Sequence, residues 1–273
     1  MVFSLFRGLV EGVPAPAAAT VWPEPYELAY RQAYGERDLR DRRRLQLFGA
    51  VPDHRYWGRP LHNPAAGQVM PLEAGSVDLF YCGHALERLT ADQARAFLQD
   101  IRRVLRPGGV LRLAALDAVL CYQAWLRRDV FVNLHYGLAY PFGAPGANTF
   151  TRETMSIWLV NQIAGQLVQS AAPDHAPVYA GKDAELDALL ASMPMAAAFD
   201  HLCGQVDPAL QAAAPSLHCS WWSRAKAKAA LAVAGFSQIL PSSSGGCIDP
   251  LMRDRATFDG NIPTLSFYID AIA

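Results

Sequence analysis

The strongest hydrophobic pattern of the chain lies between residues 76 and 117. The apolar run 77–81 predicts a buried strand. A second run, 110–116, does not alternate with polar residues, as expected for an interior strand of a parallel sheet. Between the runs, apolar residues recur at helical spacing and predict one buried helix face. These residues are Ala94, Phe97, Leu98, Ile101 and Leu105. The pattern therefore predicts a strand–helix–strand unit.

Local signals set the ends of this helix. Thr90 is placed to cap its start, and Gln93 three positions later completes a capping box. Pro107, Gly108 and Gly109 end it, because proline cannot continue a helix and glycine accepts a left-handed turn. Asp117 follows the second strand directly.

The rest of the chain is less regular. Residues 1–44 are expected to form an N-terminal helical arm, and 45–50 a first strand. Residues 118–215 are alanine-rich, with helical stretches near 118–131, 151–171 and 183–200, which predicts a helical lid or insertion. The sheet then resumes. We expect a helix at 221–234 ending at Gly235, a strand at 236–240, and a strand at 264–271 partly exposed on one face, because its apolar and polar residues alternate.

Composition fits one α/β domain with a large insertion, or two small domains. The chain has 273 residues, 52% hydrophobic and 18% charged, with a net charge of −1. That charge gives no reason to expect nucleic acid or an anionic membrane as partner. No segment reaches eighteen consecutive strongly apolar residues, and the N-terminus lacks a charged leader pattern. We expect a cytoplasmic protein, monomeric or homodimeric.

Cysteine and histidine spacing excludes the common metal and disulfide frameworks. The five cysteines include no C-x-x-C pair, and the seven histidines form no HExxH motif. We expect free thiols and no metal site.

Three sequence elements resemble one family. They are His84-Ala-Leu-Glu87-Arg88, Arg103-Val-Leu-Arg-Pro107-Gly-Gly109, and the closing Ala234-Gly235-Phe236 with Pro263 to Ala271. In this order they resemble the class I S-adenosylmethionine-dependent methyltransferases. The resemblance implies a Rossmann-like α/β fold with a seven-stranded, mainly parallel sheet. Its S-adenosylmethionine-binding core would comprise residues 45–117 and 216–273, with 118–215 as a helical lid or substrate insertion.

The cofactor half of the resemblance is degraded. Where the family has a glycine-rich turn after its first strand, this chain has Leu47-Phe48-Gly49-Ala50, with a single glycine. The acidic residue that binds the ribose in the family has no clear counterpart, and Asp53 and Asn63 both remain possible replacements. The resemblance still implies S-adenosyl-L-methionine as cofactor. The positions expected to bind it are Gly49, Asn63, Leu72, Tyr81, Cys82 and Gly83.

Candidates for catalysis lie at the expected carboxyl ends of the strands, where open α/β sheets bind ligands. They are Tyr81, His84, Asp117 and Tyr179. Each has a structural alternative: His84 could stabilise its turn, and Asp117 could cap the following helix. Glu87 suits a helix N-terminus. Because methyl transfer is an in-line displacement that needs mainly alignment, the chemistry requires no fixed catalytic pair.

Aromatic residues are expected to line the substrate side. A sulfonium cation is attracted to tyrosine and tryptophan faces by roughly 0.5–2 kcal/mol each, although core packing explains any single aromatic equally well. The residues assigned to substrate or lid are Tyr26, Tyr30, Tyr122, Tyr136, Tyr140, His218 and Trp221.

The sequence therefore favours an S-adenosylmethionine-dependent methyltransferase acting on a small-molecule metabolite, as in secondary-metabolite biosynthesis. One alternative is a same-fold enzyme that cyclises S-adenosylmethionine and releases methylthioadenosine, like azetidine-2-carboxylate synthases. A further alternative is a catalytically inactive methyltransferase-like scaffold.

Overall fold

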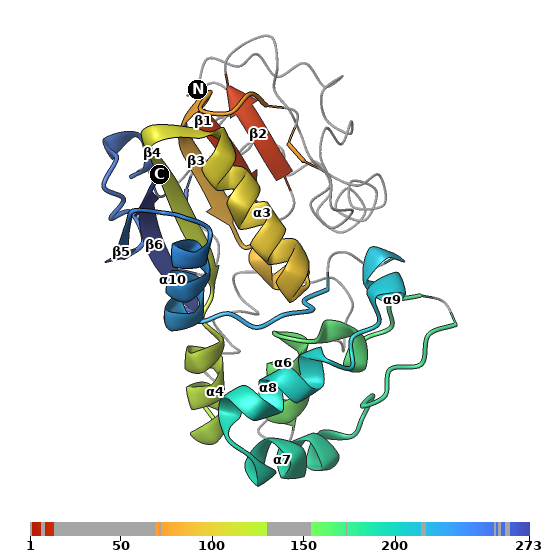
Figure 1. The fold of residues 1–273 in the computed structure, drawn as a ribbon. Helices are drawn as coiled ribbons and strands as arrows, with labels where there is room; N and C mark the ends of the chain where they lie inside the picture. The colour runs from red at the N-terminus through yellow and green to blue at the C-terminus, as the bar shows by residue number, and fades with distance from the viewer. Residues whose placement is uncertain are drawn as a thin grey trace.

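A mixed α/β fold is seen in the computed structural model, which describes residues 2–6, 9–13, 69–70, 72–129, 154–172, 174–213, 217–253, 255, 258–259 and 263–273. A sheet forms one part, and a group of helices lies beyond one of its ends (Figure 1). None of the helices in these ranges is long and apolar enough to cross a membrane.

The predicted strand–helix–strand unit is confirmed. Strand β3 (Val77–Gly83) leads through the short turn η2 (Leu86–Arg88) into helix α3 (Ala91–Val104), and strand β4 (Leu105–Leu116) follows. The capping box is present, since Thr90 Oγ1 accepts from Gln93 N at 3.4 Å and Gln93 Oε1 accepts from Thr90 N at 2.8 Å. Local sequence therefore determined this unit.

The sheet differs from the expected one. Its described strands run in the order β2-β1-β3-β4-β6-β5, six rather than seven. Strand β5 is Gln238–Ser242 and β6 is Ser266–Ile272. Only the β1–β3 and β3–β4 pairings are parallel, while the other three described pairings are antiparallel. The α/β class is confirmed, but the expectation of a mainly parallel sheet is wrong for this part of the chain.

The N-terminus also departs from the prediction of a helical arm. Residues 2–13 contain strands β1 (Val2–Phe6) and β2 (Leu9–Val13), which pair antiparallel. Strand β1 lies between β2 and β3, an interior position that suits its mostly apolar sequence. The remainder of the predicted arm, 14–44, and the predicted strand at 45–50 lie outside the described residues.

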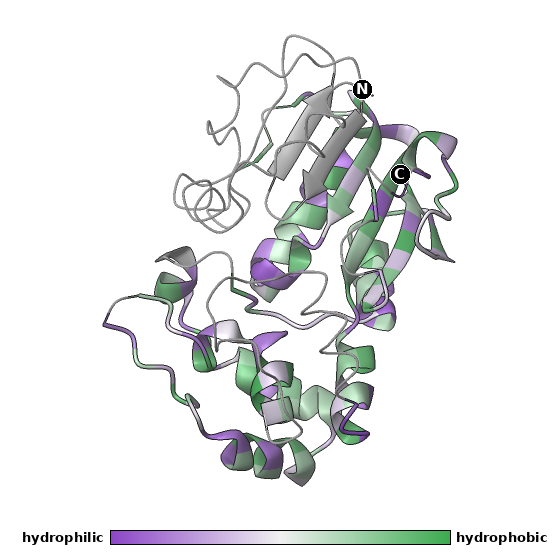
Figure 2. Ribbon diagram, turned by 180° about the vertical axis from the view of Figure 1, so that it is seen from behind, coloured by the Kyte–Doolittle hydropathy of each residue, from purple (hydrophilic) through white to green (hydrophobic). Residues whose placement is uncertain are grey.

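Helices α3 and α10 cover one face of the sheet (Figure 1). Helix α10 (Arg224–Val233) begins at its cap Ser223, and Gly235 follows its end with φ +91°, as the sequence predicts. A single core joins both helices to the apolar side chains of β3, β4 and β6, which Figure 2 shows as largely hydrophobic strands. Its central members are Phe80, Phe97, Leu98, Leu113, Leu231 and Phe267.

The opposite face carries a buried charged row. Tyr81, Arg112 and Asp270 are register neighbours on β3, β4 and β6. Arg112 Nη1 donates to Asp270 Oδ1 at 2.8 Å, and Arg112 Nη2 donates to Asp259 Oδ2 at 2.5 Å. The segment 243–259 covers this row, so β6 is buried on both faces. The expected exposed face of the last strand is therefore wrong, because its polar residue Asp270 pairs with Arg112 instead of water.

The described residues of the range 118–215 form several helices, as predicted, with an apolar core of their own around Trp158, Phe199 and Leu202. Two of the predicted helical stretches are interrupted: 151–171 after Asn161 and 183–200 at Pro194. Asp187 Oδ1 ties three of these helices together, accepting from Trp125 Nε1 at 3.1 Å and Ser156 Oγ at 2.9 Å. The elements are α4 (Ala118–Leu126), α6 (Met155–Asn161), η4 (Gly165–Leu167), α7 (Asp183–Ser192), α8 (Met195–Cys203) and α9 (Pro208–Ala213), with η5 (Pro250–Met252) later in the chain. Their role as a lid stays a prediction.

Candidate active site

His84 forms the turn at the carboxyl end of β3. Its backbone adopts φ 53°, a left-handed conformation that is unusual for a residue other than glycine. The backbone N–H of His84 holds the turn in place by donating to Ala114 O on β4 at 2.8 Å. The imidazole ring is buried. Its Nδ1 lies 3.3 Å from Glu87 Oε1, and its Nε2 lies 3.0 Å from Ser266 Oγ. Since a carboxylate only accepts, Nδ1 carries the proton.

Glu87 is the buried carboxylate of this turn. Its Oε1 accepts from Leu116 N at 2.5 Å, and its Oε2 has no hydrogen-bond partner among the described residues. Burial alone would raise the pKa of Glu87, but the hydrogen bond and charge of His84, the charge of His218 and the Leu116 N–H lower it to about 2. Glu87 is therefore ionised at neutral pH.

His218 approaches the same turn from the segment that returns from the helices to the sheet. Its Nδ1 lies 2.9 Å from Gln162 O, so Nδ1 donates and Nε2 keeps its lone pair. Burial lowers the pKa of His218 to about 4, and the charge of Arg88 adds to this while Glu87 opposes it. His218 is neutral above that pH, so near neutrality Glu87 is held ionised by the hydrogen bonds of His84 and Leu116.

We expect the folded protein to lose stability as the pH falls from 6.5 toward 4. The pKa of His218 is lower in the folded state than its ordinary 6.5, so the unfolded chain binds the proton first. At about 1.4 kcal/mol per pKa unit, discounted for the partial exposure of the ring, the loss amounts to roughly 1–3 kcal/mol. Urea unfolding at pH 7 and pH 4.5 measures it.

His218→Gln should flatten this pH dependence, because an amide does not titrate in this range. His201→Gln, at the exposed end of α8, is the matched control and should leave it unchanged. If the free energy of unfolding of His218→Gln depends on pH as steeply as that of the wild type, the acid sensitivity comes from other groups.

Asp117 proves to be a helix cap. Its Oδ1 accepts from Val119 N at 3.1 Å and from Leu120 N at 3.4 Å, which stabilises the first turn of α4. Of the two roles left open by the sequence, the structure shows the capping one. Glu87 lies in the first turn of the short 3₁₀ helix η2, in agreement with the expectation of a carboxylate at a helix N-terminus.

The described residues assigned to the cofactor are enclosed by packing. The Tyr81 ring packs against Phe258 in a tilted arrangement with ring centroids 5.0 Å apart, and its hydroxyl accepts from Asp259 N at 2.9 Å. A Cβ on Gly83 would lie 2.7 Å from Tyr81 Cε1, so the ring occupies that space. Burial raises the pKa of the Cys82 thiol. Leu72, at the margin of the core, accepts from Arg103 Nη1 at 2.8 Å.

Apart from Tyr81, the described aromatics assigned to substrate or catalysis belong to the helical core. Tyr122 packs against Trp125 and Phe199, with ring centroids 5.1 and 5.8 Å apart. Tyr179 lies at the margin of the same core. Trp221 donates through Nε1 to Asp200 Oδ1 at 2.7 Å, and the Lys226 ammonium lies 4.0 Å from its ring centroid. The structure thus brings His84 and His218 to one site and places these aromatics in packing.

Several predicted residues lie outside the described part of the chain. They are Tyr26, Tyr30, Gly49, Asn63, Tyr136 and Tyr140.

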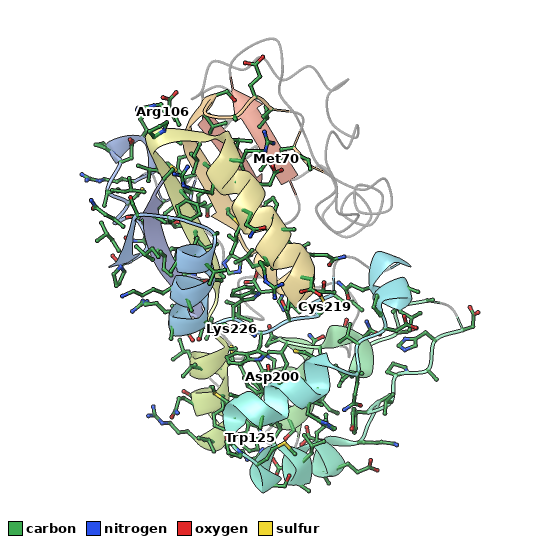
Figure 3. All side chains as sticks on the ribbon, viewed as in Figure 1. Met70, Arg106, Trp125, Asp200, Cys219 and Lys226 are labelled. Atoms are coloured by element: carbon green, nitrogen blue, oxygen red, sulfur yellow. The ribbon has the colours of Figure 1, made fainter. Side chains whose placement is uncertain are left out.

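Sequence reasoning missed the buried amides beside His218. Gln162 and Gln211 are among the few buried polar residues of the helical range, and Figure 3 places the neighbouring Cys219 where the chain passes between helices and sheet. A glutamine in an apolar helix, as at Gln162 after MSIWLVN, is the signal that could have identified one of them. Within the described residues, no three His, Cys, Asp or Glu side chains gather as a metal ion would require.

Comparison with known proteins agrees with this geometry. Residues 54–113 match the family model described as "Methyltransferase domain", which includes β3, His84, Glu87 and α3. The resemblance that the sequence suggests is thereby found in this segment, which is similar to a methyltransferase domain.

Other comparisons add little. No curated protein matches the chain. One solved structure, the complex between the Haloferax volcanii Trm112 methyltransferase activator and its candidate methyltransferase, aligns at 13% identity and a TM-score of 0.29. That alignment covers 74% of this chain and 56% of the other, so the chain spans little more than half of its length.

Proposed function

We propose that this protein transfers a methyl group from S-adenosylmethionine to a small-molecule metabolite. The methyltransferase domain match supports the reaction class. The observation that carries the proposal is the placement of an ionised, buried carboxylate, Glu87, at the carboxyl ends of the parallel strands β3 and β4. Open α/β sheets bind their ligands at this edge.

The helical range supports a small substrate. Helix α4 starts directly after β4, and the helices up to α9 lie beyond the carboxyl ends of β3 and β4 (Figure 1). Backbone bonds join the two parts at the site, since Cys219 N and Ser220 N donate to Glu87 O at 2.8 and 3.1 Å. Helices acting there as the predicted lid would favour a substrate small enough to be enclosed.

The described residues fit the cofactor's chemistry. Bound there, S-adenosylmethionine would supply an activated methyl group on a sulfonium. Its ribose hydroxyls and amino group are hydrogen-bond donors, and Glu87 Oε2 is an acceptor without a partner in the described chain. His84 and the Leu116 N–H fix the orientation of this carboxylate, so the chain provides alignment, as an in-line displacement requires.

Isothermal titration of the purified full chain tests the proposal. We expect S-adenosylmethionine and S-adenosylhomocysteine to bind with micromolar affinity, and adenosine at least tenfold more weakly. Absence of heat with both cofactors, confirmed by an unchanged melting temperature, would contradict the proposal and favour the inactive scaffold.

A further inference from the structure

Four buried side chains, three of them from segments that meet where the helices join the sheet and one from the neighbouring helical core, each carry a polar atom with no partner in the described chain. The atoms are Glu87 Oε2, Gln162 Oε1, Gln211 Oε1 and Trp158 Nε1. Their residues are 1%, 2%, 5% and 0% exposed. Nearly all buried polar groups in proteins find a partner, because an unpaired one loses its hydration without compensation. Four in one region therefore indicate a ligand.

The orientation of both amides is fixed by their other bonds. Gln162 Nε2 donates to Trp158 O at 3.3 Å. Gln211 Nε2 donates to Leu217 O at 2.8 Å and to Arg88 O at 3.4 Å. A carbonyl oxygen can only accept, so the nitrogen of each amide must face these carbonyls. The unpaired atoms are therefore oxygens.

All three residues with unpaired side-chain oxygens bond to one short segment, residues 217–220, Gln211 through its side chain and Gln162 and Glu87 through their backbone carbonyls. Leu217 O accepts from Gln211, the His218 ring donates to Gln162 O, and Cys219 N donates to Glu87 O. His218 O also accepts from Gly165 N at 2.8 Å. Trp158 lies one helical turn before Gln162 and is hydrogen-bonded to it. The residues that carry the unpaired atoms thus meet at the segment around His218.

We propose that this cluster is the subsite for the methyl acceptor and that the acceptor is a small amine. This inference rests on the proposed function. The two amide oxygens require N–H or O–H donors. The ionised Glu87 carboxylate, which is assigned to the cofactor above, has lone pairs for a second donor and disfavours an anion. An amino group supplies two or more N–H donors from one atom. The Trp158 N–H would bond a lone pair elsewhere on the same molecule.

The surroundings also favour the reactive form of the amine. Burial and the Arg88 guanidinium, which is close enough to lower the pKa of His218, both disfavour an ammonium ion, while the Glu87 carboxylate acts in the opposite direction. The amine would enter neutral, with its proton released to solvent. Its lone pair then forms the new nitrogen–carbon bond while the carbon–sulfur bond breaks and that electron pair stays on sulfur. The methylated ammonium product loses its proton to solvent on release.

Calorimetric titration with matched probes tests the subsite without turnover. Benzylamine, benzyl alcohol and benzoate share one skeleton and differ in their donors and charge. We expect the full chain, saturated with S-adenosylhomocysteine, to bind benzylamine at least tenfold more tightly than benzoate, with benzyl alcohol between them. Equal or tighter binding of benzoate would overturn the proposal.

Substitution of the two amides locates the binding. Gln162→Leu and Gln211→Leu should each weaken benzylamine binding about fivefold or more. Gln166→Leu is the matched control, because Gln166 is equally buried but both ends of its amide pair with the Asp207 backbone, at 3.2 and 2.9 Å. The affinity of Gln166→Leu for benzylamine should stay within twofold of the wild-type affinity. If a leucine variant does not fold, the corresponding methionine variant replaces it. Unchanged binding in both variants, as a cluster filled only by water would give, overturns the proposal.

A parallel titration separates this inference from the proposed function. If S-adenosylhomocysteine binds but benzylamine does not, the amine subsite is wrong and the methyltransferase proposal stands. If benzylamine binds only without S-adenosylhomocysteine, the cluster holds the cofactor's own amino group, and the acceptor proposal is overturned. If benzylamine binds as expected and S-adenosylhomocysteine does not bind at all, the proposed function fails instead.

Discussion

Replacing Arg112 with leucine is expected to lower the free energy of unfolding by about 3–5 kcal/mol, which is the usual cost of leaving buried charges unpaired. Arg112 is fully buried, and its guanidinium bonds Asp259, Asp270 and Ser243 O. Burial would lower its pKa, but the two aspartates raise it above its ordinary value, so it stays charged. Without it, both carboxylates would remain in the core, and the segment 243–259 would lose its anchor.

Arg106→Leu is the matched control for this prediction. Arg106 pairs with Asp78 at the surface, where both side chains are about half exposed, and such pairs contribute about 0–1 kcal/mol. Adding Asp259→Asn and Asp270→Asn to Arg112→Leu should recover part of the loss, because the asparagines still accept from Gly245 N and Ile248 N. Denaturant unfolding measures all of these variants. Similar losses for Arg112→Leu and Arg106→Leu would contradict the structural role assigned to the buried network.

Glu87→Gln is expected to slow methyl transfer about 100-fold or more while the chain stays folded. Glutamine has nearly the same shape and can still accept from Leu116 N, but it removes the charge that orients His84 and the ionised oxygen that faces the ligand. Losing one preorganised polar group at an active site usually costs a factor of about 10²–10³. Single-turnover rates with saturating S-adenosylmethionine, together with circular dichroism, separate activity from folding.

Glu185→Gln provides the comparison on α7. This glutamate is exposed and pairs with Lys182 at 3.7 Å, so its replacement should change neither rate nor stability. A wild-type rate in Glu87→Gln would remove Glu87 from the site and leave its hydrogen bonds a purely structural role.

The part of the fold that the sequence predicted is the part encoded by neighbouring residues. The capping box at Thr90, the apolar face of α3 and the glycines after it all act within a few positions, so the unit from β3 to β4 could be found directly. The same holds for the end of α10 at Gly235. The sequence left two roles open for Asp117, because a helix N-cap and a residue facing a ligand pocket can both follow a strand directly.

The errors concern pairings between distant residues. Asp270 lies in an alternating strand, a pattern that ordinarily indicates a solvent-facing position, yet it meets Arg112 from 158 positions earlier. The lone arginine in the apolar run 110–116 was the available signal that β4 carries a buried ion pair. The cluster around His218 was likewise hidden, because Gln162, Gln211 and Glu87 come from three separate segments and meet only through residues 217–220.

Product analysis tests the central claim most directly. The purified chain is incubated with S-adenosylmethionine, with and without a panel of small amines, and the products are identified by mass spectrometry. The account predicts S-adenosylhomocysteine and a methylated amine, formed together and only when an acceptor is present. Methylthioadenosine with a four-carbon amino acid, formed from S-adenosylmethionine alone, would contradict it and establish the cyclising alternative.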